Sequence, residues 1–338
     1  MPPEWHAHEG TWLSWPKNPL TFPARVRPAV EKTFEQMAVA LSEHEKVNLL
    51  VDDEKTKEDA GRRLDRAGAR DSNLHPHIIP SADVWIRDYG PTFLLHKKTR
   101  GRAAVKWEFN AWGNKYDDLL ADNQTGEEIA RRVQDRGVRV FHPGIVMEGG
   151  SFDVDGAGKL LTTKQCLLNK NRNPGLNQSQ ISQYLRDFLG IREIIWLSCG
   201  IEGDDTDGHV DDFARFFGEG KVLCNFSENK SDPNARVLAE NEALLRSQAS
   251  FGEIVRLPMP KPITDAEENR RLPASYANFY LANKLVLLPV FGDQKDEEAA
   301  EILASCFSGR EVLPIPAREL VFGYGGIHCA TAQEPKEG

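Results

Sequence analysis

The sequence predicts a mixed α/β protein made of repeated units, each with a hairpin, a helix and a further strand. Strand and helix patterns alternate along the chain, as they do in α/β architectures. Three predicted hairpins begin near residues 152, 213 and 279, so the unit recurs about every 60–65 residues. No linker rich in proline, glycine or serine divides the 338 residues, so we expect one closed domain rather than two. A doubly wound sheet is disfavoured, because no Gly-x-Gly-x-x-Gly motif follows a first strand.

The first half of the chain contains strand patterns separated by two helical ones. Residues 54–69 are strongly charged, and residues 117–136 carry apolar side chains at Leu120, Ile129 and Val133, so both ranges are predicted helices. Residues 84–96 are expected to be mostly extended, with a break at Gly90-Pro91. The remaining ranges are predicted strands or extended segments: 47–51, 74–80, 103–109 and 138–146.

The second half repeats the order of hairpin, helix and strand. The first hairpin joins 152–155 to 159–163 through Gly156-Ala157-Gly158, a strong turn sequence. A helix over 178–189 is expected to end at Gly190. The other predicted elements are hairpins pairing 213–217 with 222–226 and 279–281 with 284–289, helices at 234–248 and 296–307, strands at 193–197, 254–257 and 311–315, and a segment at 320–322 that leads into a glycine-rich end.

Composition and charge exclude several classes of protein. The 42 basic and 51 acidic residues give a net charge of −9, which argues against general nucleic-acid binding. No apolar run reaches the ~18 residues that a membrane span needs, and the first residues lack the basic and apolar parts of a secretory signal. The five cysteines include no Cys-x-x-Cys pair, so neither a disulfide framework nor a zinc ribbon is indicated. We expect a reduced, cytoplasmic protein that binds no nucleic acid and no membrane.

A cysteine, a histidine and an aspartate are the main chemical candidates. Cys329 follows Gly325-Gly326, where the backbone can bend closely around a ligand, and is the candidate nucleophile. His209 and Asp211 alternate with Val210, so on an extended strand they would share one face and suit acid–base chemistry. The alternatives are a buried structural cysteine and a solvated acidic loop. The spacing around His209 fits neither an EF-hand nor a zinc site, so no metal is predicted.

Four further residues complete the candidate site. Trp85 and Asp88 lie just before the Gly90-Pro91 turn. Glu148 precedes two glycines, and Asn278 offers an amide that can donate and accept. Each has a structural alternative; Asp88, for example, could form a surface ion pair with its neighbour in the sequence. A thiol, an imidazole and several carboxylates suit a planar cation with several N–H donors, such as a guanidinium. These residues predict a hydrolase or transferase that acts on a guanidino compound.

Ordered motifs also extend along nearly the whole chain. They are Pro3-Glu4-Trp5, His8-Glu9, residues 11–16, residues 85–91, Glu148-Gly149-Gly150-Ser151, Cys166-Leu167-Leu168-Asn169, Asn171-Arg172-Asn173-Pro174, residues 203–211, residues 276–280 and Gly325-Gly326-Ile327-His328-Cys329. In these motifs the sequence resembles the agmatine deiminase family and, beyond it, the bacterial peptidylarginine deiminases and the guanidino-group-modifying superfamily.

This resemblance implies a fold and a division of the chain. The fold is the pentein, a five-bladed α/β propeller of ββαβ-type repeats with pseudo-fivefold symmetry and the site at its centre. For this chain the resemblance implies a single domain over residues 1–338, with approximate repeats at 1–80, 81–145, 146–203, 204–265 and 266–338.

The resemblance also implies roles for individual residues. Cys329 resembles the nucleophile, His209 the general acid and base, and Asp88 and Asp211 the carboxylates that grip the guanidinium. The substrate-binding positions are Trp85, Glu148, Asn278 and Gly326. The implied reaction passes through a cysteine amidino-thioether and converts agmatine into N-carbamoylputrescine and ammonia, a step toward putrescine. It needs no metal and no organic cofactor.

Other functions stay open at this point. A peptidylarginine or free-arginine deiminase would need a cation for the substrate carboxylate, for which Arg87 and Arg215 are candidates, or a cleft open to a peptide. A transferase would use an amine in place of water, and a non-catalytic guanidino-binding pentein would use neither. Tyr89 and Tyr324 depart from the common agmatine deiminase pattern beside the site. The expected partner is a small cationic guanidino compound, and the chain is compatible with a homo-oligomer.

Overall fold

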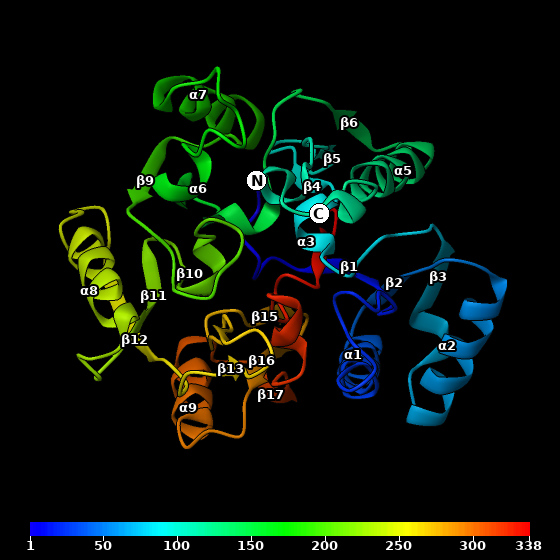
Figure 1. The fold of residues 1–338 in the computed structure, drawn as a ribbon. Helices are drawn as coiled ribbons and strands as arrows, with labels where there is room; N and C mark the ends of the chain where they lie inside the picture. Colours follow the sequence, from blue (N-terminus) through cyan, green and yellow to red (C-terminus); the bar gives the residue numbers. More distant parts are fainter.

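Five small sheets surround the centre of the molecule, and the longer helices lie on the outside (Figure 1). The structure is a computed structural model that describes residues 1–338. Four of the sheets have three strands and one has four, and each is built mainly from one continuous stretch of chain. The mixed α/β class predicted from the sequence is confirmed.

The third unit shows the repeated pattern. β7 (Phe152–Val154) and β8 (Lys159–Thr163) form an antiparallel hairpin. The chain continues through α7 (Gln178–Leu189) and returns as β9 (Glu193–Leu197), which is parallel to β8. A helical crossover of this kind is the usual way to connect two parallel strands.

Three other units repeat this order of two strands, a helix and a strand. The second contains β4 (Thr92–Leu95), β5 (Arg102–Val105), α5 (Asp122–Asp135) and β6 (Arg139–Phe141). The fourth contains β10 (Ala214–Gly218), β11 (Lys221–Phe226), α8 (Pro233–Arg246) and β12 (Glu253–Pro258). The fifth contains β15 (Tyr280–Ala282), β16 (Leu285–Val290), α9 (Asp296–Cys306) and β17 (Glu311–Pro316). The three predicted hairpins therefore begin at residues 152, 214 and 280, which confirms their spacing.

The first unit is completed by the other end of the chain. β18 (Ala332–Pro335) pairs antiparallel with β1 (His8–Ser14), and α1 (Arg27–Ser42) connects β1 to the parallel strand β2 (Lys46–Val51). α2 (Glu54–Ala67) then leads to β3 (Leu74–Ile78), so the sheet order is β18-β1-β2-β3. None of β1, α1 and β18 was predicted from the sequence. Short strands with mixed polarity, such as β1 and β18, are recognisable mainly through their partners.

Local sequence explains where α7 begins and ends. The Asn177 side chain accepts from the backbone N–H of Gln180, and the Gln180 side chain accepts from the backbone N–H of Asn177, which is a complete capping box. Gly190 ends the helix with a φ of 70°, a left-handed conformation that glycine adopts without strain. The helix predicted over 178–189 is confirmed.

Short helical turns carry many residues near the centre. They are α3 (Ile86–Tyr89), α4 (Ala111–Asn114), α6 (Lys164–Leu167) and the 3₁₀ turns Asp71–Asn73, Asp117–Leu119, Gly149–Ser151, Val210–Asp212 and Leu320–Gly323. The prediction that residues 84–96 are mostly extended is therefore wrong at α3. The N–H of Gly90 donates to the carbonyl of Ile86 at 2.9 Å and closes this single turn before β4 begins.

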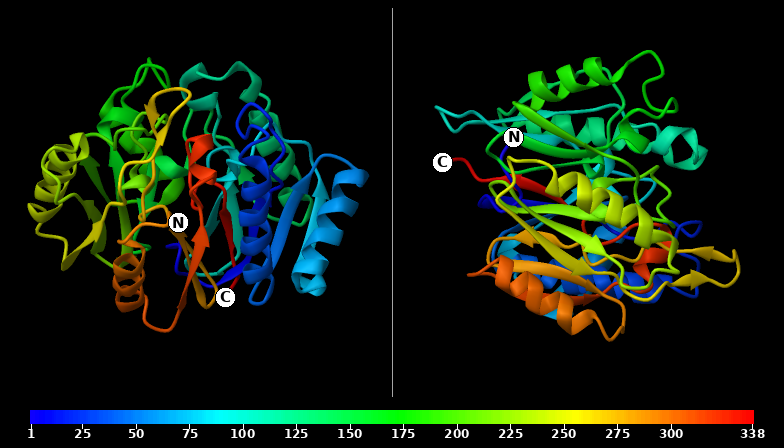
Figure 2. Two further views of the ribbon diagram at one scale, coloured as in Figure 1. Left: turned by 60° about the horizontal axis from the view of Figure 1, so that its bottom comes forward. Right: turned by 90° about the vertical axis from the view of Figure 1, so that its left-hand side faces the viewer.

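A separate two-stranded hairpin, β13 (Thr264–Asp265) and β14 (Arg270–Arg271), extends from the body of the molecule, as the right view of Figure 2 shows. The apolar core lies between the sheets and the helices; α1 alone buries Val30, Phe34, Met37 and Leu41 on one face. No helix combines the length and the apolar character needed to cross a bilayer.

Candidate active site

A cavity of about 430 Å³ has the Cys329 thiol in its lining. Trp85, Asp88 and Trp112 line it together with Cys329, and all four residues are buried. The remaining lining residues come mainly from the Leu20–Arg25 segment, the β13–β14 hairpin and the glycine-rich segment before Cys329. A cavity of this size is large enough to enclose a small organic molecule.

Asn278 holds the segment that carries Cys329. Its Nδ2 lies 3.2 Å from the Cys329 Sγ, and its Oδ1 accepts from the backbone N–H of His328 at 2.8 Å. The same Nδ2 donates to Asp212 Oδ1 at 2.9 Å. Asn278 is absent from the lining of the cavity. The structure therefore brings this predicted substrate-binding residue to Cys329, the candidate nucleophile, and not to the cavity.

The glycines before Cys329 allow close packing. A Cβ at Gly326 would lie 2.4 Å from Asn278 Oδ1, and a Cβ at Gly325 would lie 2.5 Å from the Trp85 ring. A Cβ at either position would clash, so only glycine allows the backbone to pack this closely against Asn278 and Trp85. Gly325 and Trp85 line the cavity, whereas Gly326, predicted as a substrate-binding position, packs against Asn278 instead.

His209 and Asp211 are neighbours, but the predicted strand between them is absent. Residues 210–212 form a 3₁₀ turn, and β10 begins only at Ala214, so the expected alternation along a strand is wrong. The turn still brings His209 Nδ1 to 4.0 Å from Asp211 Oδ1. The same nitrogen lies 3.8 Å from Asp88 Oδ2.

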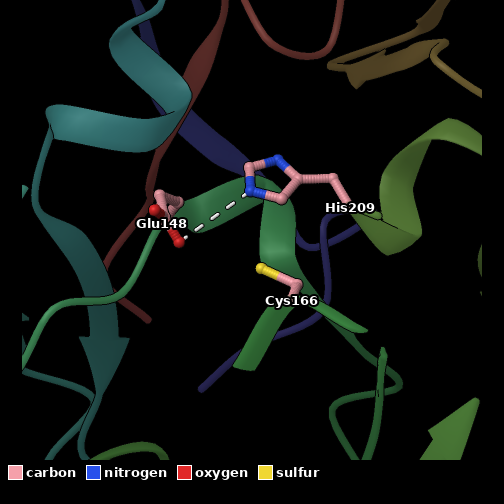
Figure 3. Close-up of side chains that lie close together, drawn as sticks. All are labelled: Glu148, Cys166 and His209. Carbon is pink, nitrogen blue, oxygen red and sulfur yellow. Dashed lines mark ion pairs between the residues drawn. The ribbon is translucent and has the colours of Figure 1, made fainter. Parts of the chain in front are cut away.

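The imidazole of His209 lies beside the side chains of Glu148 and Cys166, as Figure 3 shows. His209 Nε2 is 3.9 Å from Glu148 Oε2. Both ring nitrogens and Glu148 Oε2 are buried without a hydrogen-bond partner. Because unpaired buried polar atoms are costly, such a group of atoms indicates a place where a ligand or a moving proton is accommodated.

Two carboxylates face His209 from different elements. Asp88, on α3, accepts from Trp112 Nε1 and from the backbone N–H of Gly150, each at 2.9 Å. Asp211 Oδ2 lies 2.6 Å from His328 Nδ1, and its Oδ1 has no hydrogen-bond partner. Both carboxylates are therefore fixed in position while they keep capacity to accept N–H donors from a ligand.

Arg172 is a buried partner of Glu148 to which the sequence analysis assigned no role. Its Nε donates to Glu148 Oε1 at 2.6 Å, and its Nη1 donates to Asp207 Oδ2 at 2.6 Å. Burial alone would raise the pKa of Glu148, but the Arg172 guanidinium and His209 hold that pKa below its usual value. Glu148 is thereby kept as a carboxylate facing His209.

Replacing Arg172 with methionine is expected to lower the free energy of unfolding by about 3–5 kcal/mol, because it removes the buried cation that is hydrogen-bonded to Glu148. Urea denaturation followed by fluorescence would measure the change. Arg132→Met is the control, since Arg132 pairs with Glu128 on the surface and is expected to cost at most about 1 kcal/mol. Equal stability of the two variants would contradict the importance of the buried pair.

The charges around the thiol oppose its ionisation. Burial raises the pKa of Cys329 well above its ordinary value, and Asp211, Asp212 and Asp88 raise it further. Burial would lower the pKa of His209, but Asp88 and Glu148 more than offset this and raise it well above its usual value. Both shifts favour the protonated form, a neutral thiol at Cys329 and a charged imidazole at His209.

Two groups of side chains have the types and spacing of metal ligands. One is Glu148, Cys166 and His209, and the other is Asp211, Asp212 and Cys329; the ligand atoms of each group lie within 4.8 Å of one another. These groups contain the candidate acid–base and nucleophile. A metal ion in either group would compete with their chemistry.

The charged side chains that line the cavity besides Asp88 are mostly acidic. The carboxylates are Asp83, Asp118, Asp205, Asp265, Glu267 and Glu268, against the two cations Arg25 and Arg270. Arg270 donates to Asp205 at 2.6 Å and lies over the ring of Tyr324, 4.1 Å from its centroid. The two tyrosines that depart from the family pattern lie in different places. Tyr324 lines the cavity, whereas Tyr89 is buried outside it and donates to the Asp83 carbonyl.

The two arginines considered for a substrate carboxylate do not line the cavity. Arg87 and Arg215 are both buried and both donate to the Glu4 carboxylate, at 3.3 and 2.9 Å. Neither is free to bind a carboxylate in the cavity. The surroundings of Cys329 therefore favour a ligand that carries positive charge and no carboxylate.

Comparison with known proteins agrees with this geometry. A model of the Porphyromonas-type peptidyl-arginine deiminase family matches residues 1–335. The chain is 38% identical to an agmatine deiminase of Stutzerimonas stutzeri, over 99% of this chain and 95% of the relative. It superimposes on the agmatine deiminase of Enterococcus faecalis with a TM-score of 0.91 at 30% identity, covering 100% of this chain and 96% of the other. For a C. jejuni agmatine deiminase with substrate bound, the TM-score is 0.88 at 30% identity, with 99% and 96% covered. The chain therefore belongs to the agmatine deiminase family, within the Porphyromonas-type peptidyl-arginine deiminases.

Proposed function

We propose that this chain is a hydrolase that converts agmatine and water into N-carbamoylputrescine and ammonia. One observation carries the proposal: Cys329 lines a mostly acidic cavity, its thiol lies 3.9 Å from Asp211 Oδ2, and the His209 imidazole lies within 4.0 Å of both Asp211 and Asp88. Family membership supports the same reaction, because relatives at 37–38% identity over nearly the full length bear that name.

The guanidinium is bound first. Asp88 and Asp211 accept its N–H groups, which holds the planar cation with its carbon facing Cys329 Sγ. Trp85 forms a wall beside the methylene chain of the substrate. The positive charge of the guanidinium offsets the carboxylates around the thiol, so Cys329 can lose its proton to solvent and form a thiolate.

Two displacements at one carbon follow. The Cys329 thiolate forms an S–C bond to the guanidino carbon, His209 gives a proton to one nitrogen, and the C–N bond breaks to release ammonia. An amidino-thioether remains on the enzyme. Water then adds to the same carbon and gives one of its protons to His209. The C–S bond breaks to return the thiolate, and the remaining hydroxyl proton passes to solvent as the ureido C=O forms. The carboxylate of Glu148, held by Arg172, keeps the imidazole oriented through both steps.

The electrostatics lead to a paired test on Asp88. Replacing Asp88 with asparagine removes a charge that raises the thiol pKa, so the pKa of Cys329 in the ligand-free protein is expected to fall. The rate of alkylation of Cys329 by iodoacetamide, followed against pH by peptide mass spectrometry, would show this. At the same time kcat/KM is expected to fall at least about tenfold, because an N–H partner of the cation is lost. A more reactive thiol with unchanged turnover would contradict the role of Asp88.

A substrate panel tests the proposed reaction. Ammonia release is measured with agmatine, free arginine and a blocked peptidyl-arginine. Agmatine is expected to have the highest kcat/KM, because its amine carries a positive charge toward an acidic wall and the cavity offers no unpaired cation for a carboxylate. Turnover of the peptide without turnover of agmatine would reject the proposal in favour of a peptidylarginine deiminase.

We also propose that residues 1–338 form one domain with the five-bladed pentein architecture. The five sheets with their ββαβ order and the pairing of β18 with β1 support it. In this arrangement the ends of the chain meet in the first blade. The site then lies where the five blades approach one another.

A further inference from the structure

Asp211 depends on a single partner for its orientation. Its Oδ2 accepts from His328 Nδ1 at 2.6 Å, and the only other contact of that oxygen is the Cys329 Sγ at 3.9 Å. Its Oδ1 has no hydrogen-bond partner, and His209 Nδ1 lies 4.0 Å from it. Asp88, by contrast, is held by two separate N–H donors, one on each oxygen. Whatever fixes His328 therefore also fixes Asp211.

Glu4 fixes His328 from the opposite side of the imidazole. Glu4 Oε2 lies 2.7 Å from His328 Nε2, so both ring nitrogens of His328 face a carboxylate oxygen. The other oxygen of Glu4 accepts from Arg215 Nη2 at 2.9 Å and from the backbone N–H of Leu281 at 2.8 Å. Glu4, His328 and Asp211 are all buried.

The mechanism described above makes no use of Glu4, although Glu4 is a charged side chain buried near the centre of the protein. Burial would raise its pKa, but Arg215, His328 and Arg87 hold it well below the usual value. Arg87 links this network to the nucleophile a second time, because its Nε donates to the His328 carbonyl and its backbone N–H donates to the Cys329 carbonyl, both at 3.2 Å. Buried charge-assisted hydrogen bonds of this kind restrain the groups that they join. In this network Asp211 Oδ1 and Arg215 Nε stay without a hydrogen-bond partner.

We propose that Glu4 is a positioning residue for the substrate cation: through His328 it holds Asp211 so that the free Oδ1 faces the guanidinium bound in front of Cys329. The inference rests on the proposed guanidino chemistry. It makes the N-terminal segment a part of the active site, although Glu4 touches neither the cavity nor the thiol. Removing the Glu4 charge should weaken the recognition of cations more than it weakens the reactivity of the thiol.

Labelling of Cys329 with two reagents separates these effects. Chloroacetamidine is a cation shaped like a guanidinium and needs the carboxylates, whereas iodoacetamide is neutral and needs only the thiol. In Glu4→Gln, the labelling rate of Cys329 with chloroacetamidine is expected to fall about tenfold relative to that with iodoacetamide. The KM for agmatine is expected to rise by a similar factor, with a smaller change in kcat.

A matched control excludes a general loss of structure. Glu334 is also buried, also pairs with two arginines, Arg102 and Arg136, and contacts neither His328 nor Asp211. Glu334→Gln should therefore lower the Tm about as much as Glu4→Gln while leaving the ratio of labelling rates unchanged. An equal change of the ratio in both variants, or no change in either, would overturn the proposal.

A second variant covers the case in which Glu4→Gln does not fold. His328→Gln keeps Glu4 paired with its arginines and breaks the connection to Asp211, so it should lower the same ratio. If neither variant folds, the network serves folding and the positioning role is rejected. Labelling needs no turnover, so it tests the positioning role separately from the proposed function. Wild-type protein that labels well with chloroacetamidine but releases no ammonia from agmatine would reject the proposed function and leave the role of Glu4 to the labelling ratio.

Discussion

Replacing Cys329 with serine is expected to reduce ammonia release by at least about 10⁴-fold, because a hydroxyl does not ionise where the thiol does. The change is nearly isosteric at a buried position, so the protein should fold with its wild-type Tm. Calorimetric titration should still detect agmatine, since Asp88 and Asp211 remain. Binding without turnover is the expected combination.

A second cysteine provides the control for this loss. Cys306 is partly exposed on α9 and is absent from the lining of the cavity, so Cys306→Ser should keep full activity. Substantial activity of Cys329→Ser, or an equal loss in both variants, would contradict the assignment of the nucleophile. Loss of agmatine binding in Cys329→Ser would show that the thiol contributes to the grip on the cation.

Replacing His209 with glutamine is expected to lower kcat by about 10²–10⁴-fold, the range for loss of a general acid and base. Both nitrogens of His209 lack hydrogen-bond partners, so the imidazole is free to exchange protons with the reacting groups. A nitrogen leaving group needs a proton, whereas a thiolate does not. An S-alkyl isothiourea analogue of agmatine should therefore release about one thiol per molecule of the His209→Gln variant in a rapid first phase.

The analogue also locates the step that His209 serves. After the first phase the amidino-thioether should persist, because no base remains to activate water. Continuous turnover of the analogue by His209→Gln would show that His209 is dispensable for hydrolysis of the intermediate. If His209→Gln reacts no faster with the analogue than with agmatine, then protonation of the leaving group by His209 does not limit the reaction.

The parts of the structure that local sequence determines could be predicted. The hairpin over 152–163 has its turn glycines next to two apolar strands, and α7 has both of its caps within the sequence of the helix ends. The candidate catalytic residues lie in short motifs with glycines beside polar side chains. Cys329, His209, Asp88 and Asp211 could be named because their chemistry is unusual in such a pattern, and the structure brings these four together.

The parts that depend on distant partners could not be predicted. β18 acquires its place only by pairing with β1, more than 300 residues away. Trp112 contributes an indole N–H to Asp88 from a segment that lies in none of the motifs. Glu4 and Arg172 do lie in motifs, but their roles arise from contacts with His328 and Glu148. A single sequence carries no information on which buried charges meet.

The geometry between His209 and Asp211 illustrates a different limit. Alternation along a strand would place both side chains on one face, and a 3₁₀ turn also brings them together with a different backbone. The spacing of two residues was therefore sufficient to suggest that they act together. It was not sufficient to determine the element that carries them.

Mass spectrometry of the protein quenched in acid during turnover tests the covalent mechanism most directly. With agmatine, the peptide that contains Cys329 is expected to gain the mass of agmatine less ammonia, and the signal should be strongest in His209→Gln treated with the isothiourea analogue. No other cysteine-containing peptide should change. Turnover of agmatine with no adduct on Cys329 at any time, or with an adduct on another cysteine, would contradict nucleophilic attack by this thiol.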